Sequence, residues 1–200
     1  ITSAINIEEY LKGNPKAFST THIFSSSRFR YVGGTKIKCW STHANGKHAN
    51  ENLAEALNNS CNPIFVDIAL SLGKSTFYDY LKKFSFGLST GIDYSGEAIG
   101  MLVSESVVTD NDLARIGFGQ TIAVTPLQLV SAVASVINGG KYYVPHLAKK
   151  IYNDELKVSE EFENKVKGIT IGEQTSKILN GYLEDVVTVG SGKNAYIKGY

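Results

Sequence analysis

One stretch decides the fold prediction: Asn59-Ser60-Cys61-Asn62-Pro63-Ile64-Phe65-Val66-Asp67-Ile68-Ala69-Leu70-Ser71-Leu72-Gly73. Asn62 followed by Pro63 is a strong helix start, because the Asn side chain accepts from unpaired backbone N–H groups and proline needs no donor at the first helical position. Apolar residues recur at helical spacing up to Leu72, and Gly73 can end the helix in a left-handed conformation. The stretch therefore predicts an amphipathic helix with Asn62 as its N-cap.

Further helices and a hairpin are predicted on both sides of this stretch. Capping residues and helical spacing predict helices that begin near Ile1, Asn50, Ser75, Thr125 and Thr170. The last of these follows from the capping-box spacing of Thr170 and Glu173. Residues 28–40, interrupted by Gly33-Gly34, predict a hairpin, and residues 144–152 predict a strand. Together these elements indicate a mainly helical chain with some β-structure.

Length and composition are those of one folded domain or a large piece of one. The chain has 200 residues, of which 42% are hydrophobic and 20% charged, so it can bury a core. Its 20 basic and 19 acidic residues give a formal net charge of +1. This balance gives no electrostatic reason to expect a nucleic-acid partner or an anionic membrane surface. No apolar run approaches the roughly 18 residues that a membrane span needs.

Ser60 and Asn62 are the candidate catalytic residues of the deciding stretch. A turn between two helices would point the Ser60 hydroxyl and the Asn62 amide to the same side, because residues two apart share a face there. The alternative is purely structural: Ser60 ends one helix and Asn62 caps the next. Three residues of the form S-x-N do not decide between the two.

Motifs within and beyond this stretch carry a resemblance to a known family. They are Cys39-Trp40, residues 52–62, Thr90-Gly91-Ile92-Asp93, Gly96-Glu97-Ala98, Ile116-Gly117-Phe118-Gly119-Gln120, Thr125-Pro126-Leu127-Gln128-Leu129, Pro145-His146-Leu147 and Gly190-Ser191-Gly192-Lys193-Asn194-Ala195. In this order they resemble the transpeptidase domain of class B penicillin-binding proteins, and most of all the sporulation-specific members of the stage V sporulation protein D type. The resemblance covers nearly the whole chain.

The resemblance implies an α+β fold like that of the serine β-lactamases, in which helices flank a five-stranded antiparallel sheet. It also implies three catalytic motifs: S-x-x-K with the nucleophilic serine, S-x-N across the cleft, and K-T-G on the opposite strand. Ser60 and Asn62 match the second motif. We expect residues 1–200 to be a partial domain that lacks the S-x-x-K and K-T-G segments, and to be inactive alone because the nucleophile is not in the chain.

The implied function is that of a peptidoglycan D,D-transpeptidase, which cross-links stem peptides through a serine acyl-enzyme and is trapped by β-lactams. Ser60 would relay a proton and Asn62 would bind the amide of the donor peptide. The family also implies a place outside the cytoplasmic membrane on an N-terminal helix, around the forespore for the sporulation members, a cell-wall synthesis complex as partner, and no required cofactor. A non-catalytic penicillin-binding-like module is the alternative.

Two other motifs are set aside as sites. Ser71-Leu72-Gly73-Lys74 has the S-x-x-K spacing, but Gly73 is predicted to end the helix, so Lys74 would not lie one turn from Ser71. Gly190-Ser191-Gly192-Lys193-Asn194 is similar to the end of a phosphate-binding loop, but Asn194 stands where a Ser or Thr should bind magnesium. We expect a turn before a strand there.

A candidate zinc site comes from the spacing of Cys39, His43 and His48, with His22 or a water as the fourth ligand. Thiolate and imidazole are the ligands that tetrahedral zinc prefers, often with three to five residues between pairs. The alternative is an ordinary polar loop. For Cys39 and Cys61 one disulfide, two thiols and metal ligation all remain open.

Overall fold

The computed structural model describes residues 1–25, 27–44 and 48–199. Its helices are α1 (Thr2–Leu11), α2 (Leu53–Asn59), α3 (Asn62–Leu72), α4 (Lys74–Lys83), α5 (Asp110–Gly117), α6 (Pro126–Ile137), α7 (Glu173–Thr188) and the 3-10 turn η2 (Lys193–Ala195). Its strands are β1 (Phe24–Ser25), β2 (Phe29–Val32), β3 (Thr35–Lys38), β4 (Asn50–Glu51), β5 (Met101–Leu102), β6 (Ile122–Ala123), β7 (Lys141–Tyr143), β8 (Lys150–Tyr152), β9 (Val158–Glu161) and β10 (Val166–Ile169). Among the described residues, no helix combines the length and apolar character needed to cross a bilayer.

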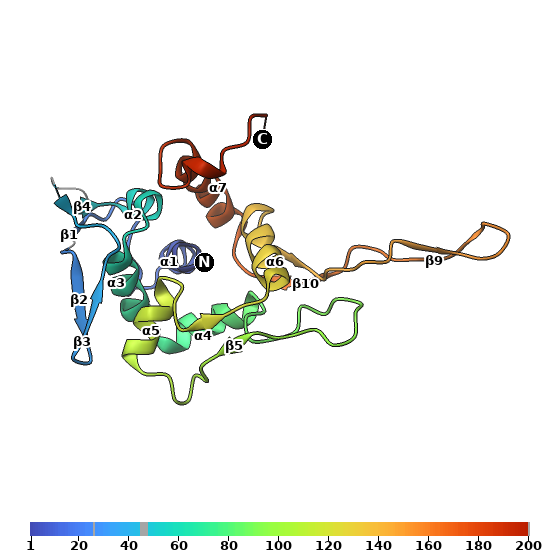
Figure 1. Ribbon diagram of the computed structural model, residues 1–200, viewed down its shortest axis with the longest axis horizontal. Helices are drawn as coiled ribbons and strands as arrows, with labels where there is room; N and C mark the ends of the chain where they lie inside the picture. The colour runs from blue at the N-terminus through green and yellow to red at the C-terminus, as the bar shows by residue number, and fades with distance from the viewer. Residues whose placement is uncertain (26, 45–47, 200) are drawn as a thin grey trace.

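The strands pair in antiparallel ladders of two: β1 with β4, β2 with β3, β5 with β6, β7 with β10 and β8 with β9. The α+β class is confirmed, whereas a five-stranded sheet does not form within the described ranges. The β2–β3 hairpin turns at Gly33 and Gly34, both with positive φ, as predicted. Figure 1 shows the β8–β9 hairpin extending far from the helical body.

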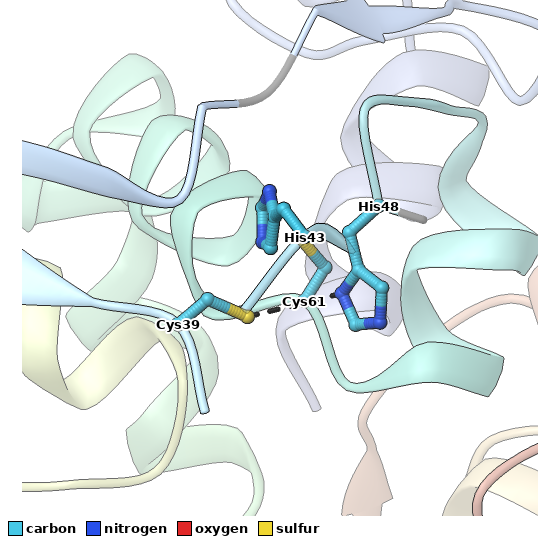
Figure 2. A group of neighbouring side chains, drawn as sticks. All are labelled: Cys39, His43, His48 and Cys61. Carbon is cyan, nitrogen blue, oxygen red and sulfur yellow. Dashed lines mark hydrogen bonds between the residues drawn. The ribbon is translucent and has the colours of Figure 1, made fainter. Parts of the chain in front are cut away.

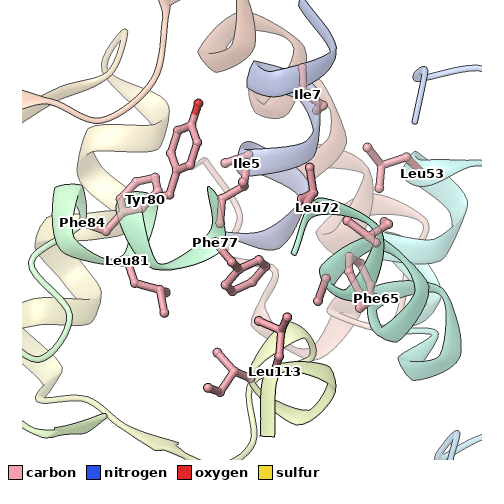
Figure 3. Close-up of a cluster of buried hydrophobic side chains, with 14 of the residues drawn as sticks. Ile5, Ile7, Leu53, Phe65, Leu72, Phe77, Tyr80, Leu81, Phe84 and Leu113 are labelled. Carbon is pink, nitrogen blue, oxygen red and sulfur yellow. The ribbon is translucent and has the colours of Figure 1, made fainter. Parts of the chain in front are cut away.

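Helix α1 lies in the middle of the helical body and supplies much of the core (Figure 1). Seven of its ten residues are buried, from Thr2 to Glu8. Its apolar side chains pack with those of α3, α4 and α5 in one cluster, part of which is drawn in Figure 3: Ile5, Ile7, Leu72, Phe77, Leu81 and Leu113. The cluster fixes the positions of α2 and α3, whose junction carries Ser60 and Asn62.

Helix starts agree with the sequence prediction in part. Thr125 caps α6 in a full capping box with Gln128, as its Thr-Pro signal predicts. The helix predicted to begin at Asn50 is instead capped by Asn52, because Asn50 pairs in β4 and Asn52 forms a capping box with Glu55. The predicted cap at Ser75 is wrong, since α4 already begins at Lys74 after the left-handed Gly73.

Two further predictions need correction. Thr170 does not cap α7, because the N-cap of this helix is Gly172. The Thr170 hydroxyl donates instead to the Ser135 hydroxyl and to the Gly140 carbonyl. Residues 144–152 form a strand only at their end, in β8, because residues 141–143 pair with β10 and the segment between bends.

The two motifs set aside as sites take structural roles. The Ser71 hydroxyl donates to the Lys16 carbonyl and the Lys74 ammonium to the Val108 carbonyl, so the two groups serve different partners. The glycine-rich segment after α7 contains a turn, but it leads into η2 rather than into a strand within the described residues.

Candidate active site

The site is built on the turn between α2 and α3. Ser60 is the C-cap of α2 and has a left-handed backbone, with φ of 53° and ψ of 49°, which is uncommon for a residue with a Cβ. The N–H groups of Ser60 and Cys61 donate to the carbonyls of Leu57 and Ala56, so α2 itself holds this turn. Cys61 is fully buried, whereas Ser60 is exposed. The turn therefore leaves Ser60 accessible while Cys61 anchors it in the core.

The Trp40 indole holds the same turn from outside. Its Nε1–H donates to the carbonyl oxygens of Asn59 at 3.0 Å and of Ser60 at 3.1 Å. The Asn59 amide donates to the buried Glu51 carboxylate at 2.6 Å. Trp40 and Glu51 thus hold the turn in place, although the left-handed backbone of Ser60 is locally disfavoured.

Asn62 is not the N-cap of α3, which corrects the sequence prediction. Cys61 holds that position, and α3 has no side-chain cap. Asn62 lies at the first helical position, before Pro63, and its Nδ2 donates to the Lys38 carbonyl at 3.2 Å. Because its amide has two N–H donors and an acceptor oxygen, this bond uses only one of its donors. Capping therefore does not account for the asparagine at this position.

Ser60 and Asn62 line one cavity of about 450 Å³ together with the first residues of α1. Ile1, Thr2 and Ser3 form part of its wall, and most of the remaining lining is apolar, including Phe65, Phe77 and Leu129. The Thr2 hydroxyl donates to the Gly117 carbonyl at 2.6 Å, which ties the start of α1 to α5 at the cavity edge. A pocket with an apolar lining and a few polar groups is typical of a small-molecule or peptide site.

Two motif residues hold together the loops that follow α4. The fully buried Gln128 donates through Nε2 to the carbonyls of Ser85, Leu88 and Ile99, which joins three loop segments to α6. Glu97 accepts from the Ser89 hydroxyl and from the backbone N–H of Thr90 at 2.7 Å. Burial opposes ionisation of Glu97, but these hydrogen bonds outweigh it and lower its pKa to about 2.

A cluster of four metal-ligating side chains lies directly behind the turn. One ligand atom from each of Cys39, His43, His48 and Cys61 lies within 4.8 Å of the others. His22, the fourth ligand expected from sequence, lies elsewhere: it is exposed and its ring packs against Phe18 and Phe24. The sequence prediction had His22 or a water as the fourth ligand, whereas in the structure Cys61 lies in the cluster and His22 lies outside it.

Two features of the site do not follow from the sequence: the place of Cys61 in the cluster, since metal ligation is only one of three states left open for it, and the contacts of Trp40. Cys61 is 22 positions from Cys39, so its part in the cluster follows only from the way α3 packs behind β3. Trp40 offered a signal, since an indole N–H beside a polar turn needs an acceptor, but its partners lie 19 and 20 positions away.

The family model described as the penicillin-binding protein transpeptidase domain matches residues 14–200. The chain belongs to this family. Stage V sporulation protein D of Bacillus subtilis is 39% identical over 170 residues, which are 84% of this chain and 26% of that protein. The peptidoglycan D,D-transpeptidase MrdA of Haemophilus influenzae is 28% identical over 123 residues, 57% of this chain and 19% of that protein.

Solved penicillin-binding proteins have the same fold. Penicillin-binding protein 3 of Mycobacterium tuberculosis, complexed with aztreonam, superposes with a TM-score of 0.85 at 21% identity, over all of this chain and 44% of that one. The D,D-transpeptidase domain of the Eggerthella lenta peptidoglycan glycosyltransferase gives a TM-score of 0.82 at 19% identity, over 98% of this chain and 50% of that one. This chain therefore spans about a quarter of the length of its Bacillus relative and about half of the length of these two solved chains.

Proposed function

We propose that this chain is the central part of a peptidoglycan D,D-transpeptidase, in which Ser60 and Asn62 are the second catalytic motif. The observation that carries the proposal is the shared cavity of Ser60, Asn62 and the start of α1. In the family the serine nucleophile and its lysine stand just before the segment that Ile1 to Ile5 resemble. The gene-encoded protein would then bring the nucleophile to the wall that Ile1 and Thr2 form, opposite Ser60.

The proposed reaction has two halves. In acylation, the nucleophilic serine oxygen bonds to the donor carbonyl, the peptide bond to the terminal D-Ala breaks, and the serine proton ends on the departing amine. In the second half, the amine of a neighbouring stem peptide attacks the ester, loses a proton and releases the serine. Both halves move a proton between oxygen and nitrogen across the cavity.

Ser60 has the geometry of a proton relay. Its hydroxyl is both a donor and an acceptor, and its exposed position on the cavity wall leaves the hydroxyl accessible to a substrate. Its left-handed turn is fixed by the Trp40 indole and by α2, so little reorganisation is needed when a proton moves.

Asn62 is proposed to bind the donor peptide. Its amide is held in place by the Lys38 carbonyl and has a further donor and an acceptor oxygen for a peptide group. Most of the remaining lining is apolar, so a bound peptide that covers it would displace water and strengthen such hydrogen bonds. Stem peptides and β-lactams are the proposed ligands, because a β-lactam amide can acylate the same serine without a leaving group that diffuses away.

The biological setting is proposed from the relatives. The B. subtilis relative is named for sporulation, so we propose a role in wall or spore-cortex synthesis within a cell-wall synthesis complex. The protein would act on the outer side of the cytoplasmic membrane, around the forespore, anchored by a helix outside residues 1–200.

Labelling of the gene-encoded protein with a fluorescent penicillin, followed by peptide mapping, tests the proposal. We expect one adduct, on a serine that precedes Ile1 in the gene-encoded sequence. Ser71→Ala, a matched serine variant on α3 outside the cavity, should label as the parent does. Absence of any adduct would favour the alternative, a non-catalytic module, and an adduct on Ser60 or Ser71 would contradict the assigned roles.

A further inference from the structure

The four-residue cluster behind the turn has the donor set of a zinc site (Figure 2). Cys39 follows β3, His43 and His48 belong to the loop before β4, and Cys61 lies between α2 and α3. Two segments that are separate in sequence, the 39–49 loop and the α2–α3 turn, thus place two thiols and two imidazoles around one point. Two sulfur and two nitrogen ligands are a set that tetrahedral zinc takes in structural sites.

The distances between the ligand atoms are slightly longer than those in a zinc site, so the four side chains would move closer together on binding a metal. In a tetrahedral zinc centre, ligand atoms stand about 3.3 to 3.8 Å apart, given bonds of about 2.0 to 2.3 Å. Cys39 Sγ and His48 Nδ1 are 3.8 Å apart, and no pair of ligand atoms in the cluster exceeds 4.8 Å. Shifts of about 1 Å or less would complete the coordination.

Burial separates this cluster from a chance gathering of surface groups. Cys39, His48 and Cys61 are 4%, 6% and 0% exposed, and His43 is half-buried. Buried polar side chains need partners, and closed structural metal sites are shielded from solvent in this way. His43 is the most exposed of the four side chains.

The loop that carries both histidines is poor in apolar side chains. Residues 39–49 read Cys-Trp-Ser-Thr-His-Ala-Asn-Gly-Lys-His-Ala, with no aliphatic side chain larger than alanine. The Trp40 ring is 64% exposed, so it does not anchor the loop in the core. His43 and His48 both have positive φ, at 56° and 61°, a conformation that persists only where surrounding contacts impose it.

We propose that Cys39, His43, His48 and Cys61 bind one structural zinc ion, which fastens the 39–49 loop to the Ser60–Asn62 turn. Binding releases the protons of both thiols to solvent and uses neutral imidazole nitrogens. Because Cys61 is the middle residue of the Ser60-Cys61-Asn62 motif, the ion would fix this motif from its buried side. The zinc inference does not depend on the proposed transpeptidase activity.

Elemental analysis of the gene-encoded protein, purified without a polyhistidine tag and in the presence of a reductant, tests the proposal. We expect about one zinc per chain, and less than about 0.2 per chain in Cys61→Ser and in His43→Ala. His22→Ala is the matched control, since this exposed histidine lies outside the cluster; it should keep the parental zinc content.

Two further measurements remain decisive if a cysteine variant fails to fold. Exchange of the parental protein with Co²⁺ should give the absorption of a tetrahedral thiolate-bound ion, and a chelator should lower its melting temperature. Less than about 0.2 zinc per chain with an unchanged melting temperature in chelator would overturn the proposal. So would a Cys39–Cys61 disulfide in protein purified under reductant, or loss of zinc in His22→Ala.

Discussion

The carboxylate of Glu8 accepts a hydrogen bond of 2.7 Å from the backbone N–H of Gly172, the N-cap residue of α7. The same oxygen accepts from the Thr175 hydroxyl at 2.6 Å, and the other lies 3.1 Å from the Lys12 ammonium. A residue of α1 therefore supplies the cap that α7 lacks in its own sequence. Because α1 also lines the cavity, this contact couples the C-terminal helix to the position of the site.

Glu8→Gln should destabilise the protein in a pH-dependent way. Burial raises the pKa of Glu8, but hydrogen bonds from Thr175 and Gly172 and the Lys12 charge outweigh it, so its pKa lies below the ordinary value. A lowered pKa means that the stabilisation is present above the ordinary value, about 4.3, and is lost as pH falls through the folded value. At pH 7 the free energy of unfolding of the variant should be roughly 1.5 to 3 kcal/mol lower than that of the parent.

Denaturant unfolding of parent and variant between pH 7 and pH 3 checks this prediction. The difference in free energy of unfolding should shrink on acidification, because the parental carboxylate becomes protonated. Glu163→Gln, at an exposed position beyond β9, should change the free energy of unfolding by less than about 0.5 kcal/mol. A Glu8→Gln difference that stays constant with pH would show that charge plays no part.

Gly117 is required where α5 crosses α3. A Cβ there would lie 2.6 Å from the Ala69 Cβ and 2.8 Å from the Phe65 carbonyl oxygen. Gly117→Ala should therefore lower the free energy of unfolding by roughly 1 to 3 kcal/mol through overpacking. Thermal or denaturant unfolding measures this change. Gly181→Ala is the matched control. Gly181 lies in α7 with open space where a Cβ would stand, so this substitution should raise the free energy of unfolding by about 0.5 to 1 kcal/mol. Equal effects of the two substitutions would contradict the close helix crossing.

Asn62→Ala should impair acylation far more than stability. Removal of one amide hydrogen bond to the substrate, worth about 1 to 3 kcal/mol, should lower the second-order acylation rate of the gene-encoded protein roughly 5- to 150-fold. The melting temperature should fall little, because Asn62 does not cap α3 and loses only the partly exposed bond to Lys38. Asn153→Ala, in the β8–β9 hairpin, should acylate at the parental rate. A large fall in melting temperature with parental acylation would make Asn62 structural.

Local signals in the sequence predicted a large part of the fold. The Thr125-Pro126 start, the Gly33-Gly34 turn and the helix from residue 62 to Leu72 all depend on residues within a few positions of each other, and all are confirmed. Thr170 was misassigned because its spacing to Glu173 fits a capping box, but the long-range contact to Ser135 is satisfied instead. The N-terminus of α7 is capped by Glu8, which lies 164 positions away from Gly172, so no local sequence pattern could predict it.

The site could be predicted only as far as the family resemblance reached. Ser60 and Asn62 were named from the S-x-N motif, and the structure adds that they share a cavity with the start of α1. For the metal cluster, loop spacing predicted Cys39, His43 and His48. The fourth side chain of the cluster depends on tertiary packing, which brings Cys61 beside Cys39 and leaves His22 against Phe18.

The acylation rate of Ser60→Ala in the gene-encoded protein tests the central claim most directly. If Ser60 relays a proton, a time course of penicillin acylation should show a rate lowered roughly 10²- to 10⁴-fold, the usual range for loss of a positioned proton-transfer group. The melting temperature should stay close to the parental value, because Ser60 is exposed and its turn is held by backbone bonds and by Trp40. Acylation at the parental rate with a markedly lower melting temperature would contradict the account and make Ser60 a structural residue.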